Sequence, residues 1–473
     1  MDRINRREFL RLSALAGLSP VLSRHGLAEL SQNDVVNVAI IGIGNQGQVH
    51  LNHLLTQIQG VRVQAVCDIW GRGRQIGERL CRLYQHPGRA YKDYREMLDG
   101  ESGLDAVLIT VPDFVHHEIT IASLDAGLHV YCEKEMSNDI EKARSMVQAA
   151  RRSGKLLQIG HQRRSSPAYL YAHELVHGHG LIGLIDAVSG RWHQEVQILP
   201  PPKRLMQKYR IEPAVLEKYG YGSFAEFYNW RQFRKYCGGP MADLGTHQVD
   251  VFDWFLDAVP VSVQATGRTD YFERLAKEHQ AGYVPNNFDQ VQASYEWSTG
   301  RDTVKGDYRV DQRSAKGGIF ENMVGLQASM RFSEAEPELR MRPRNAAPAP
   351  GPFFHNADEQ AIAFNAEQLR KILCDGCGLR GTALDPSAQG QGAATDVNSV
   401  AFFTEAQIVW AESMRRPPHV YHLENFFAAI RDKNIPLTCP GERGFETCVL
   451  TLKTDEAART GKPIHFEPSD FVA

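Results

Sequence analysis

The chain has 473 residues, a length typical of two or more domains with a large buried core. Hydrophobic residues make up 42% and charged residues 23%, and the formal net charge of -3 leaves no basic excess that would indicate a nucleic-acid partner. Eight cysteines are too few for a disulfide scaffold. The one CxxC pair, Cys374 and Cys377, lacks the second pair of a zinc site, so we expect a disulfide or plain thiols and no metal.

The N-terminus has the features of a targeting segment. Arg6 and Arg7 precede a mildly apolar run, residues 11–22, that is too short to span a bilayer. This pattern predicts a twin-arginine signal over residues 1–28, with a disordered basic tail as the alternative. Because that route exports folded proteins, it predicts a periplasmic protein with its cofactor already bound. No later segment is apolar enough to predict membrane insertion.

Residues 34–158 alternate between short apolar runs and helical patterns. Alternation of this kind predicts a doubly wound parallel sheet, the Rossmann dinucleotide-binding architecture. The expected strands are Val35–Ile43, Val61–Cys67, Ala106–Val111, His129–Cys132 and Leu156–Ile159.

Residues 159–473 follow a different rhythm. Strand-like stretches such as Ile185–Trp192 and Asp289–Trp297 lack regular intervening helices, which predicts an α+β domain with a mostly antiparallel sheet for substrate binding and oligomerisation. Residues 334–400 are rich in proline, alanine and glycine, and we expect a loop-rich insertion there. Val420–Lys433 is predicted to be an amphipathic helix.

The segment 42–47 reads G-x-G-x-x-G between a predicted strand and a predicted helix. Gly42 permits a tight turn, Gly44 lets the backbone approach a pyrophosphate, and Gly47 lets helix and strand pack closely. The helix N-terminus favours phosphate. Asp68, 21 residues after Gly47, is placed to accept hydrogen bonds from the adenosine ribose, which favours NAD over NADP. The alternatives are NADP, held by arginines at 72 and 74, and a glycine turn without a ligand.

Glu133 and Lys134 directly follow the predicted strand His129–Cys132. The carboxyl end of a parallel strand is where ligands bind in open α/β sheets. A lysine there is placed near the nicotinamide and can hydrogen-bond a substrate hydroxyl as hydride leaves the carbon. A solvated charged turn is the alternative.

Asp243 and His247 lie four residues apart at the start of a predicted helix that follows Gly238 and Gly239. A histidine can take a hydroxyl proton near neutral pH, and the aspartate can orient it or bind a second hydroxyl. The alternatives are a helix-capping aspartate beside a packed histidine, and a metal site for which no third ligand is evident.

Arginine and tryptophan side chains follow several predicted strands, a combination suited to hydrogen-bonding a sugar and stacking on its ring. For each tryptophan, core packing is the alternative. The predicted substrate-binding residues are Lys134, Arg163, Arg164, Trp192, His193, Tyr228, Asp243 and His247.

These motifs together resemble the glucose–fructose oxidoreductase/inositol dehydrogenase/rhizopine-catabolism (Gfo/Idh/MocA) family over most of residues 34–300 and 420–466. Members are usually NAD(P)-dependent dehydrogenases of sugars, inositols and related polyols, and an open sheet mediates their oligomers. The resemblance rests on the segments 42–47 (GIGNQG), 91–98 (YKDYREML), 111–116 (VPDFVH), 132–134 (CEK), 160–164 (GHQRR) and 238–250 (GGPMADLGTHQVD).

The resemblance implies that Lys134 is the lysine of the family's Glu-Lys-Pro motif, and that Asp243 and His247 are its paired catalytic residues. It also implies a homo-oligomer, a dimer or tetramer, formed through the open sheet. The cofactor-binding residues expected from the fingerprint and the resemblance are Gly42, Gly44, Asn45, Gln46, Gly47, Asp68, Thr110, Pro112, His116, Glu133, Lys134, His161, Trp230 and Arg231.

The sequence departs from the family at Glu135, which stands where proline is usual. If the Lys-Pro bond of relatives is cis, a non-proline residue disfavours that geometry, so we expect a trans bond between Lys134 and Glu135.

Three functions are consistent with these motifs. The first is an exported dehydrogenase that oxidises a sugar or glycoside hydroxyl with tightly bound, recycled NAD. The second is a glycosidase that oxidises its substrate transiently, eliminates the aglycone, adds water and reduces again; Lys134 favours net redox, because the known glycosidase branch lacks this lysine. The third is a non-catalytic sugar-binding protein, against which the intact set of Lys134, Asp243 and His247 argues.

Overall fold

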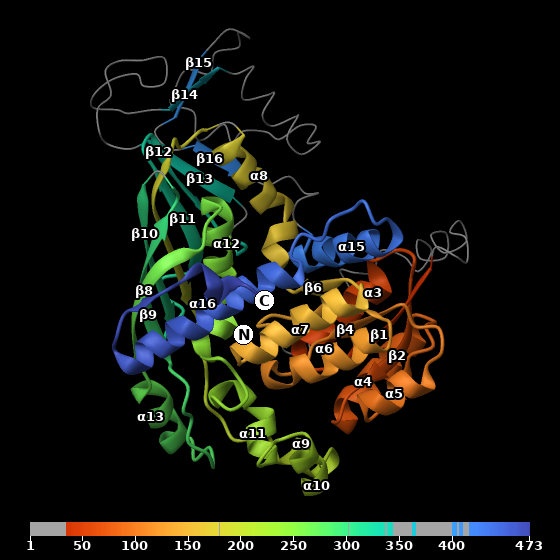
Figure 1. The fold of residues 1–473 in the computed structure, drawn as a ribbon. Coiled ribbons are helices and arrows are strands. Elements are labelled where there is room, and N and C mark those ends of the chain that lie inside the picture. The colour runs from red at the N-terminus through yellow and green to blue at the C-terminus, as the bar shows by residue number, and fades with distance from the viewer. Residues whose placement is uncertain are drawn as a thin grey trace.

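The computed structural model describes residues 35–178, 180–300, 302–335, 338–343, 362–365, 400–403, 406–409 and 416–473. The predicted signal segment, Cys374, Cys377 and most of the predicted insertion lie outside these residues. Within the described ranges, no helix combines the length and the apolar character needed to cross a membrane. Figure 1 shows a smaller domain built around one sheet beside a second, larger curved sheet.

The N-terminal domain is the predicted doubly wound fold. Its sheet has the order β3-β2-β1-β4-β5-β6, and every strand pair is parallel. The strands are β1 (Val36–Ile41), β2 (Val61–Cys67), β3 (Arg89–Tyr91), β4 (Ala106–Ile109), β5 (His129–Cys132) and β6 (Leu157–Ile159). The helices are α3 (Asn45–Thr56), α4 (Gly71–Leu83), α5 (Tyr94–Gly100), α6 (His116–Asp125) and α7 (Ile140–Ser153).

The strands of this sheet are buried because helices cover both faces. Every residue of β4 is buried, and Val38 and Ile40 of β1 are fully buried, as their unbroken apolar runs require. The chain runs from β1 outward to β3 and then returns to β4 on the other side of β1. This reversal opens a crevice at the carboxyl ends of β1 and β4, where ligands of such folds bind.

The second domain is the predicted mostly antiparallel sheet, with the order β16-β13-β12-β11-β7-β10-β9-β8-β17. Only the pair β7 and β10 is parallel among its described strands. The strands are β7 (Ile185–His193), β8 (Pro260–Arg268), β9 (Gln290–Ser298), β10 (Thr303–Asp311), β11 (Ile319–Gly325), β12 (Ala328–Phe332), β13 (Glu338–Pro343), β16 (Ala406–Val409) and β17 (Ile464–His465). A separate pair comprises β14 (Ile362–Asn365) and β15 (Val400–Phe403).

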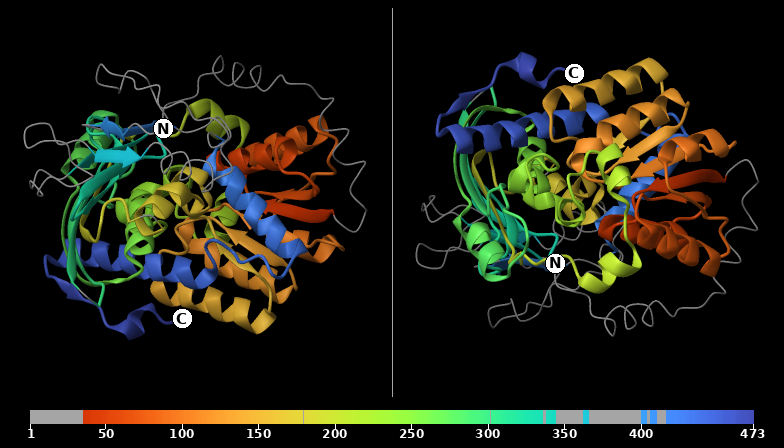
Figure 2. Two further views of the ribbon diagram at one scale, coloured as in Figure 1. Left: turned by 90° about the horizontal axis from the view of Figure 1, so that it is seen from above. Right: turned by 90° about the horizontal axis from the view of Figure 1, so that it is seen from below.

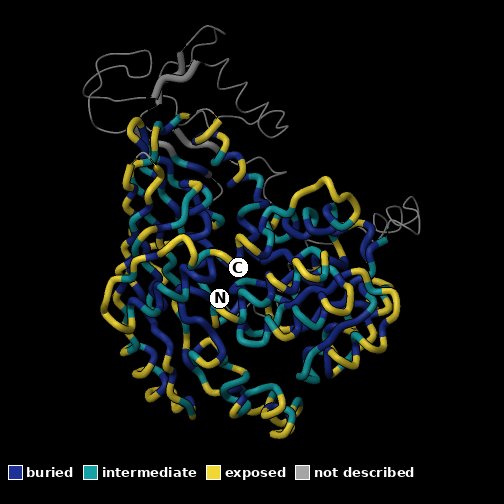
Figure 3. Tube along the Cα trace, in the orientation of Figure 1, coloured by how far each residue is buried: buried dark blue, intermediate teal, exposed yellow. Residues whose placement is uncertain are grey.

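One face of the large sheet is packed and the other is open. In β9, β10 and β12, buried residues alternate with less buried ones, the pattern of a sheet covered on one side. The covering helices are α8 (Pro167–His177), α12 (Thr246–Leu256) and α16 (Gly441–Thr460), and Figure 3 shows the buried chain concentrated between the layers.

The C-terminal helices join the two domains. Helix α15 (Pro418–Arg431) buries Leu423, Phe426 and Phe427 in the same cluster as β1 and β4, and therefore packs on the N-terminal sheet. Helix α16 contacts both α7 and β8, and Figure 2 shows it running from one domain to the other. Segments far apart in the sequence therefore fix the relative placement of the two sheets.

Short helices form an arm beneath the N-terminal domain (Figure 1). Trp70, after β2, reaches this arm: its indole Nε1 donates to the Tyr209 carbonyl at 2.7 Å, and its ring meets Phe224 and Phe227 edge-on. The helices are α9 (Lys203–Lys208), α10 (Pro213–Lys218) and α11 (Phe224–Tyr228); a further helix, α13 (Asp270–Glu278), follows β8.

Candidate active site

The turn between β1 and α3 has the geometry of a dinucleotide cradle. Gly42 has φ +94°, and a Cβ there would lie 2.7 Å from the Thr110 carbonyl oxygen. A Cβ at Gly47 would lie 1.9 Å from the Gly42 carbonyl oxygen, whereas one at Gly44 would meet nothing within 4 Å. No side chain caps the N-terminus of α3. Free space beside uncapped N–H groups fits a pyrophosphate.

Asp68 lies at the carboxyl end of β2 and is held by the backbone. Its carboxylate accepts hydrogen bonds from the N–H groups of Ile43 at 2.8 Å and Trp70 at 2.7 Å. Burial raises the pKa of Asp68, and these hydrogen bonds oppose that rise. Arg74 donates to the Asp68 and Ile69 carbonyls, while Arg72 lies over the Trp70 ring. The carboxylate is thus fixed at the edge of the crevice, in the place a ribose hydroxyl requires.

A cleft of about 1420 Å³ extends from this cradle to the large sheet. Because it is lined by both domains, it can hold a dinucleotide and a second ligand together. The predicted site residues that line it are Gly42, Gly44, Asn45, Gln46, Asp68, Thr110, Pro112, Glu133, Lys134, Arg163, Trp192, Tyr228, Trp230, Arg231, Asp243 and His247.

Five predicted residues lie outside this lining: Gly47, His116, His161, Arg164 and His193. His116 is buried, with its ring nitrogens 2.8 Å from the Glu135 carbonyl oxygen and 2.7 Å from that of Val111, so it links two loops behind the cleft. Nδ1 of His193 lies 2.5 Å from the Lys316 carbonyl oxygen. His161 is buried near the His247 ring, with a centroid distance of 6.4 Å.

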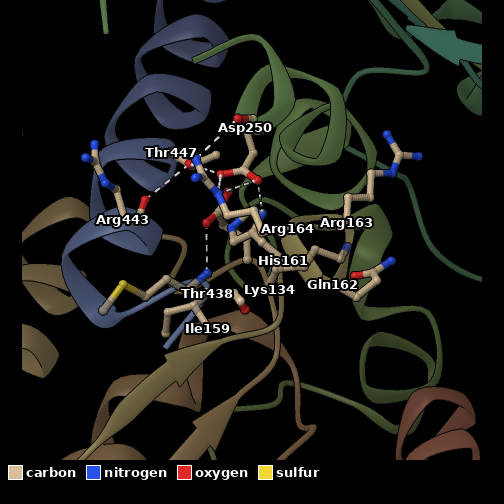
Figure 4. Close-up of polar contacts among 12 residues, drawn as sticks. Lys134, Ile159, His161, Gln162, Arg163, Arg164, Asp250, Thr438, Arg443 and Thr447 are labelled. Carbon is tan, nitrogen blue, oxygen red and sulfur yellow. Dashed lines mark hydrogen bonds and ion pairs between the residues drawn. The ribbon is translucent and has the colours of Figure 1, made fainter. Parts of the chain in front are cut away.

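Arg163 and Arg164 point to opposite sides, as Figure 4 shows. Arg164 donates to the Asp250 carboxylate at 2.9 and 3.0 Å, away from the cleft. Arg163 faces the cleft but is buried against Glu321 and Glu334. Both follow β6 in a single 3₁₀ turn, residues 162–165, which sends neighbouring side chains in different directions.

Lys134 and Asp243 meet in the cleft. Lys134 Nζ donates to the Asp243 carbonyl and lies 3.6 Å from its carboxylate, which also accepts from Arg231 Nε at 3.0 Å. Asp243 occupies a π-helical turn, residues 241–245, directly before α12. Burial favours its protonated form, but the charges of Arg231 and Lys134 outweigh this and lower the pKa of Asp243. The three side chains therefore form an ionic cluster in which one carboxylate lies between two cations.

His247, in the first turn of α12, lies beside this cluster. Its ring stacks on Trp192 with a centroid distance of 5.6 Å and an interplanar angle of 20°. Burial, together with the charges of Lys134 and Arg163, lowers the pKa of His247 well below its usual value. Its Nδ1 is buried without a hydrogen-bond partner among the described residues. The imidazole is therefore neutral at neutral pH, and its free ring nitrogen is available to a ligand hydroxyl.

Glu133 is held by His50, a residue the sequence did not single out. His50 Nε2 lies 2.5 Å from Glu133 Oε1, and both side chains are buried. Burial opposes ionisation of Glu133, but the hydrogen bond and charge of His50 outweigh it and lower the pKa of Glu133 to about 2. The His419 ring lies 5.4 Å from the His50 ring and lines the cleft. His50 comes from α3 and His419 from α15, so only the fold brings them together.

The expectation of a trans bond after Lys134 is wrong: the Lys134–Glu135 peptide bond is cis. Glu135 is fully buried, and its carboxylate accepts from the Thr451 hydroxyl at 2.7 Å and from the Met136 N–H at 2.8 Å. Its carbonyl lies 2.8 Å from His116 Nδ1. The expectation considered only the intrinsic preference of a non-proline residue for a trans bond. In the folded chain, His116 of α6 and Thr451 of α16 both contact Glu135.

Asp113 is a further cleft residue, absent from the predicted site residues. It begins the short turn after β4, and its buried Oδ2 has no hydrogen-bond partner among the described residues. Burial and the nearby Asp243 carboxylate raise the pKa of Asp113 to about 7, against the charges of Lys134 and Arg231. Its position directly after a parallel strand, within the segment 111–116, was the available signal.

Two family profiles match the chain. Residues 36–161 match "Oxidoreductase family, NAD-binding Rossmann fold", and residues 215–310 match "GFO/IDH/MocA C-terminal domain". The chain is 30% identical over 170 residues to an inositol 2-dehydrogenase of Salmonella paratyphi B, a stretch of 36% of this chain and 48% of that protein. The chain thus spans about half the length of such relatives.

Solved structures extend the similarity of fold to 91% of the chain. A levoglucosan dehydrogenase in complex with NADH and levoglucosan superposes with a TM-score of 0.65 at 16% identity, covering 91% of this chain and 99% of that one. An aldose–aldose oxidoreductase from Caulobacter crescentus superposes with a TM-score of 0.61 at 16% identity, covering 91% and 100%. Residues 36–161 and 215–310 thus match, in order along one chain, an NAD-binding Rossmann domain and a C-terminal domain of the Gfo/Idh/MocA oxidoreductases.

Proposed function

We propose that the protein is an NAD-dependent oxidoreductase that oxidises a hydroxyl group of a sugar, polyol or glycoside. One observation carries this proposal: Lys134, Asp243 and His247 meet in the cleft whose other end is the dinucleotide cradle. Relatives named as inositol and levoglucosan dehydrogenases support polyhydroxylated substrates.

The cradle would hold the dinucleotide through Gly44, the N-terminus of α3 and Asp68, and when bound NAD would supply the two-electron acceptor. The chain's own residues handle the proton. Neutral His247 takes the hydroxyl proton, and the ammonium group of Lys134 stabilises the negative charge that develops on the substrate oxygen. Asp243 balances Lys134 and keeps its Nζ in place. The stacked Trp192 ring fixes the orientation of His247.

Export and cofactor recycling complete the proposal. The N-terminal pattern supports a twin-arginine signal and a periplasmic location. Free NAD is scarce outside the cytoplasm, so an exported enzyme is expected to keep its NAD bound and to regenerate it with a second substrate. The similar fold of an aldose–aldose oxidoreductase supports a sugar as that second substrate.

The open face of the large sheet is the proposed surface for a homo-oligomer, a dimer or tetramer. Its exposed residues include Val261 and Gln264 on β8 and Lys305 on β10, the strands on either side of β9. Light scattering of the purified protein tests this: a monomer at micromolar concentration would remove oligomerisation from the proposal.

The decisive experiment uses the purified protein without added cofactor. Bound dinucleotide is released by denaturation and identified, and the intact protein is incubated with a panel of sugars and glycosides. We expect bound NAD, and keto-sugar that accumulates only when an acceptor sugar or dye is present. Free aglycone without net keto-sugar would instead identify the redox-assisted glycosidase. Protein that carries no dinucleotide and binds none would contradict both.

A further inference from the structure

Arg163 is one of the side chains predicted to bind substrate, yet it is buried beneath its own ion pairs. It donates through one terminal nitrogen to Glu321 and through Nε to Glu334 Oε2 at 3.0 Å. Its guanidinium lies over the Trp192 ring at 5.7 Å, and only 1% of the side chain is exposed. A ligand in the cleft therefore has almost no access to this cation.

Glu334 is the exposed partner in this cluster. Its side chain is 24% exposed and lines the cleft. Its Oε2 accepts hydrogen bonds from Arg163 Nε at 3.0 Å and from the side-chain amide of Gln162 at 3.5 Å. Oε1 receives no hydrogen bond from the rest of the described chain, so it can accept one from a ligand.

The Arg163–Glu334 pair is connected to the proposed catalytic residues through one aromatic ring. The Trp192 ring stacks on His247, and the guanidinium of Arg163 lies over the same ring. The indole Nε1 donates to the side chain of Gln194 at 3.0 Å. Glu334 and His247 thus belong to the same wall of the cleft, at the end that the dinucleotide cradle does not occupy.

We propose that Glu334 is a specificity-determining residue that accepts a hydrogen bond from a substrate hydroxyl, and that this wall selects uncharged sugars over sugars bearing carboxylate or phosphate groups. The inference rests on the proposed function and deepens it. A sugar hydroxyl can always donate a hydrogen bond to a carboxylate, and bonds of this kind are among the stronger ones. An anionic group placed against the free Oε1 of Glu334 meets like charge.

The other cations of the cleft work against this expectation. Lys134 and Arg231 share the single carboxylate of Asp243, so this cluster keeps a net charge of about +1. Arg231 is the more exposed of the two and lies over the Trp230 ring at 4.2 Å. It is the group an anionic substrate would have to use, and the test therefore includes it.

The experiment compares matched substrates: glucose with glucuronate, and inositol with an inositol phosphate. Reduction of the bound dinucleotide is followed by absorbance, and binding by quenching of tryptophan fluorescence. We expect the uncharged member of each pair to have the lower KM and Kd by at least about 10-fold. Glu334→Gln should raise KM for the uncharged sugar by about 10-fold and change kcat by a smaller factor. The KM values of the uncharged and the anionic sugar should therefore differ less in this variant than in the unaltered protein. Glu278→Gln, on α13 outside the cleft, is the matched control and should leave both constants unchanged.

An equal or lower KM for the anionic sugars would overturn the inference and leave the proposed oxidoreductase intact. If Arg231→Ala then lost activity on the anionic sugars, Arg231 would be the cation that binds them. An unchanged preference in Glu334→Gln would also overturn it. If no sugar reduces the dinucleotide, the proposed function fails, and the binding measurements still decide the inference: tighter binding of anionic sugars, or binding of neither class, contradicts it.

Discussion

The two ends of the cleft are built in different ways. The dinucleotide end is made by backbone groups and glycines from the short connection between β1 and α3, with Asp68 added from the next strand. The substrate end is made by side chains: Lys134 follows β5, Asp243 and His247 surround the start of α12, and Glu334 follows β12. Substitutions should therefore separate cofactor binding from chemistry.

The largest separation is expected at Asp243, whose carboxylate lies between Lys134 and Arg231. Asp243→Asn removes the one negative charge between the two cations, which positions Lys134, so we expect kcat to fall by on the order of 100-fold. The bound dinucleotide should remain at the level of the unaltered protein. Turnover and dinucleotide content, measured on one preparation, check this.

Asp307→Asn, on the open face of the large sheet, is the matched control and should alter neither quantity. Loss of dinucleotide together with turnover in Asp243→Asn would show that the two ends of the cleft are not independent.

The two glycines of the cradle, Gly44 and Gly47, test the dinucleotide end of the cleft. A Cβ at Gly47 collides with backbone, so Gly47→Ala should lower the free energy of unfolding by about 1–3 kcal/mol. A Cβ at Gly44 meets no protein atom but enters the space assigned to the pyrophosphate. Gly44→Ala should therefore leave the stability of the dinucleotide-free protein unchanged and weaken dinucleotide binding. Urea unfolding and dinucleotide titration of both variants distinguish these effects; equal stability losses would place protein, not ligand, beside Gly44.

A smaller, pH-dependent effect is expected where the domains join. His422 of α15 is buried, with Nε2 2.9 Å from the Ile159 carbonyl oxygen and Nδ1 2.7 Å from the Ser165 hydroxyl. Burial lowers the pKa of His422 to about 3 from 6.5, so between these values the unfolded chain binds a proton that the folded chain does not. Stability should therefore fall as pH drops below 6.5, by about 1.4 kcal/mol per pH unit from this group.

His422→Asn should flatten this acid dependence, measured as the free energy of unfolding in urea at several pH values. His465→Asn, an exposed histidine on β17, is the matched control and should not change the slope. An equal slope in the unaltered protein and His422→Asn would contradict the proposed titration.

The difference between the two ends of the cleft also explains how much of the site could be predicted from the sequence. The glycine fingerprint and Asp68 are close in sequence, and Lys134 follows a strand whose carboxyl end must face the crevice, so their places were predictable. Which of Arg163 and Arg164 faces the cleft depends on one 3₁₀ turn, and no pattern distinguishes two adjacent arginines.

Contacts between distant segments were beyond prediction. His50 reaches Glu133 across 83 residues, and Thr451 reaches Glu135 across 316 residues. The cis bond after Lys134 belongs to the same class, because the buried surroundings of Glu135 come from elements far along the chain. Local propensity describes none of these, since tertiary packing decides them.

We propose that Lys134 acts on the substrate while the cradle holds the cofactor independently. A single-turnover experiment on Lys134→Met tests it most directly, with bound dinucleotide quantified before an oxidisable sugar is added. We expect full dinucleotide occupancy and a rate of dinucleotide reduction at least about 100-fold below that of the unaltered protein. Reduction at an unchanged rate would contradict it.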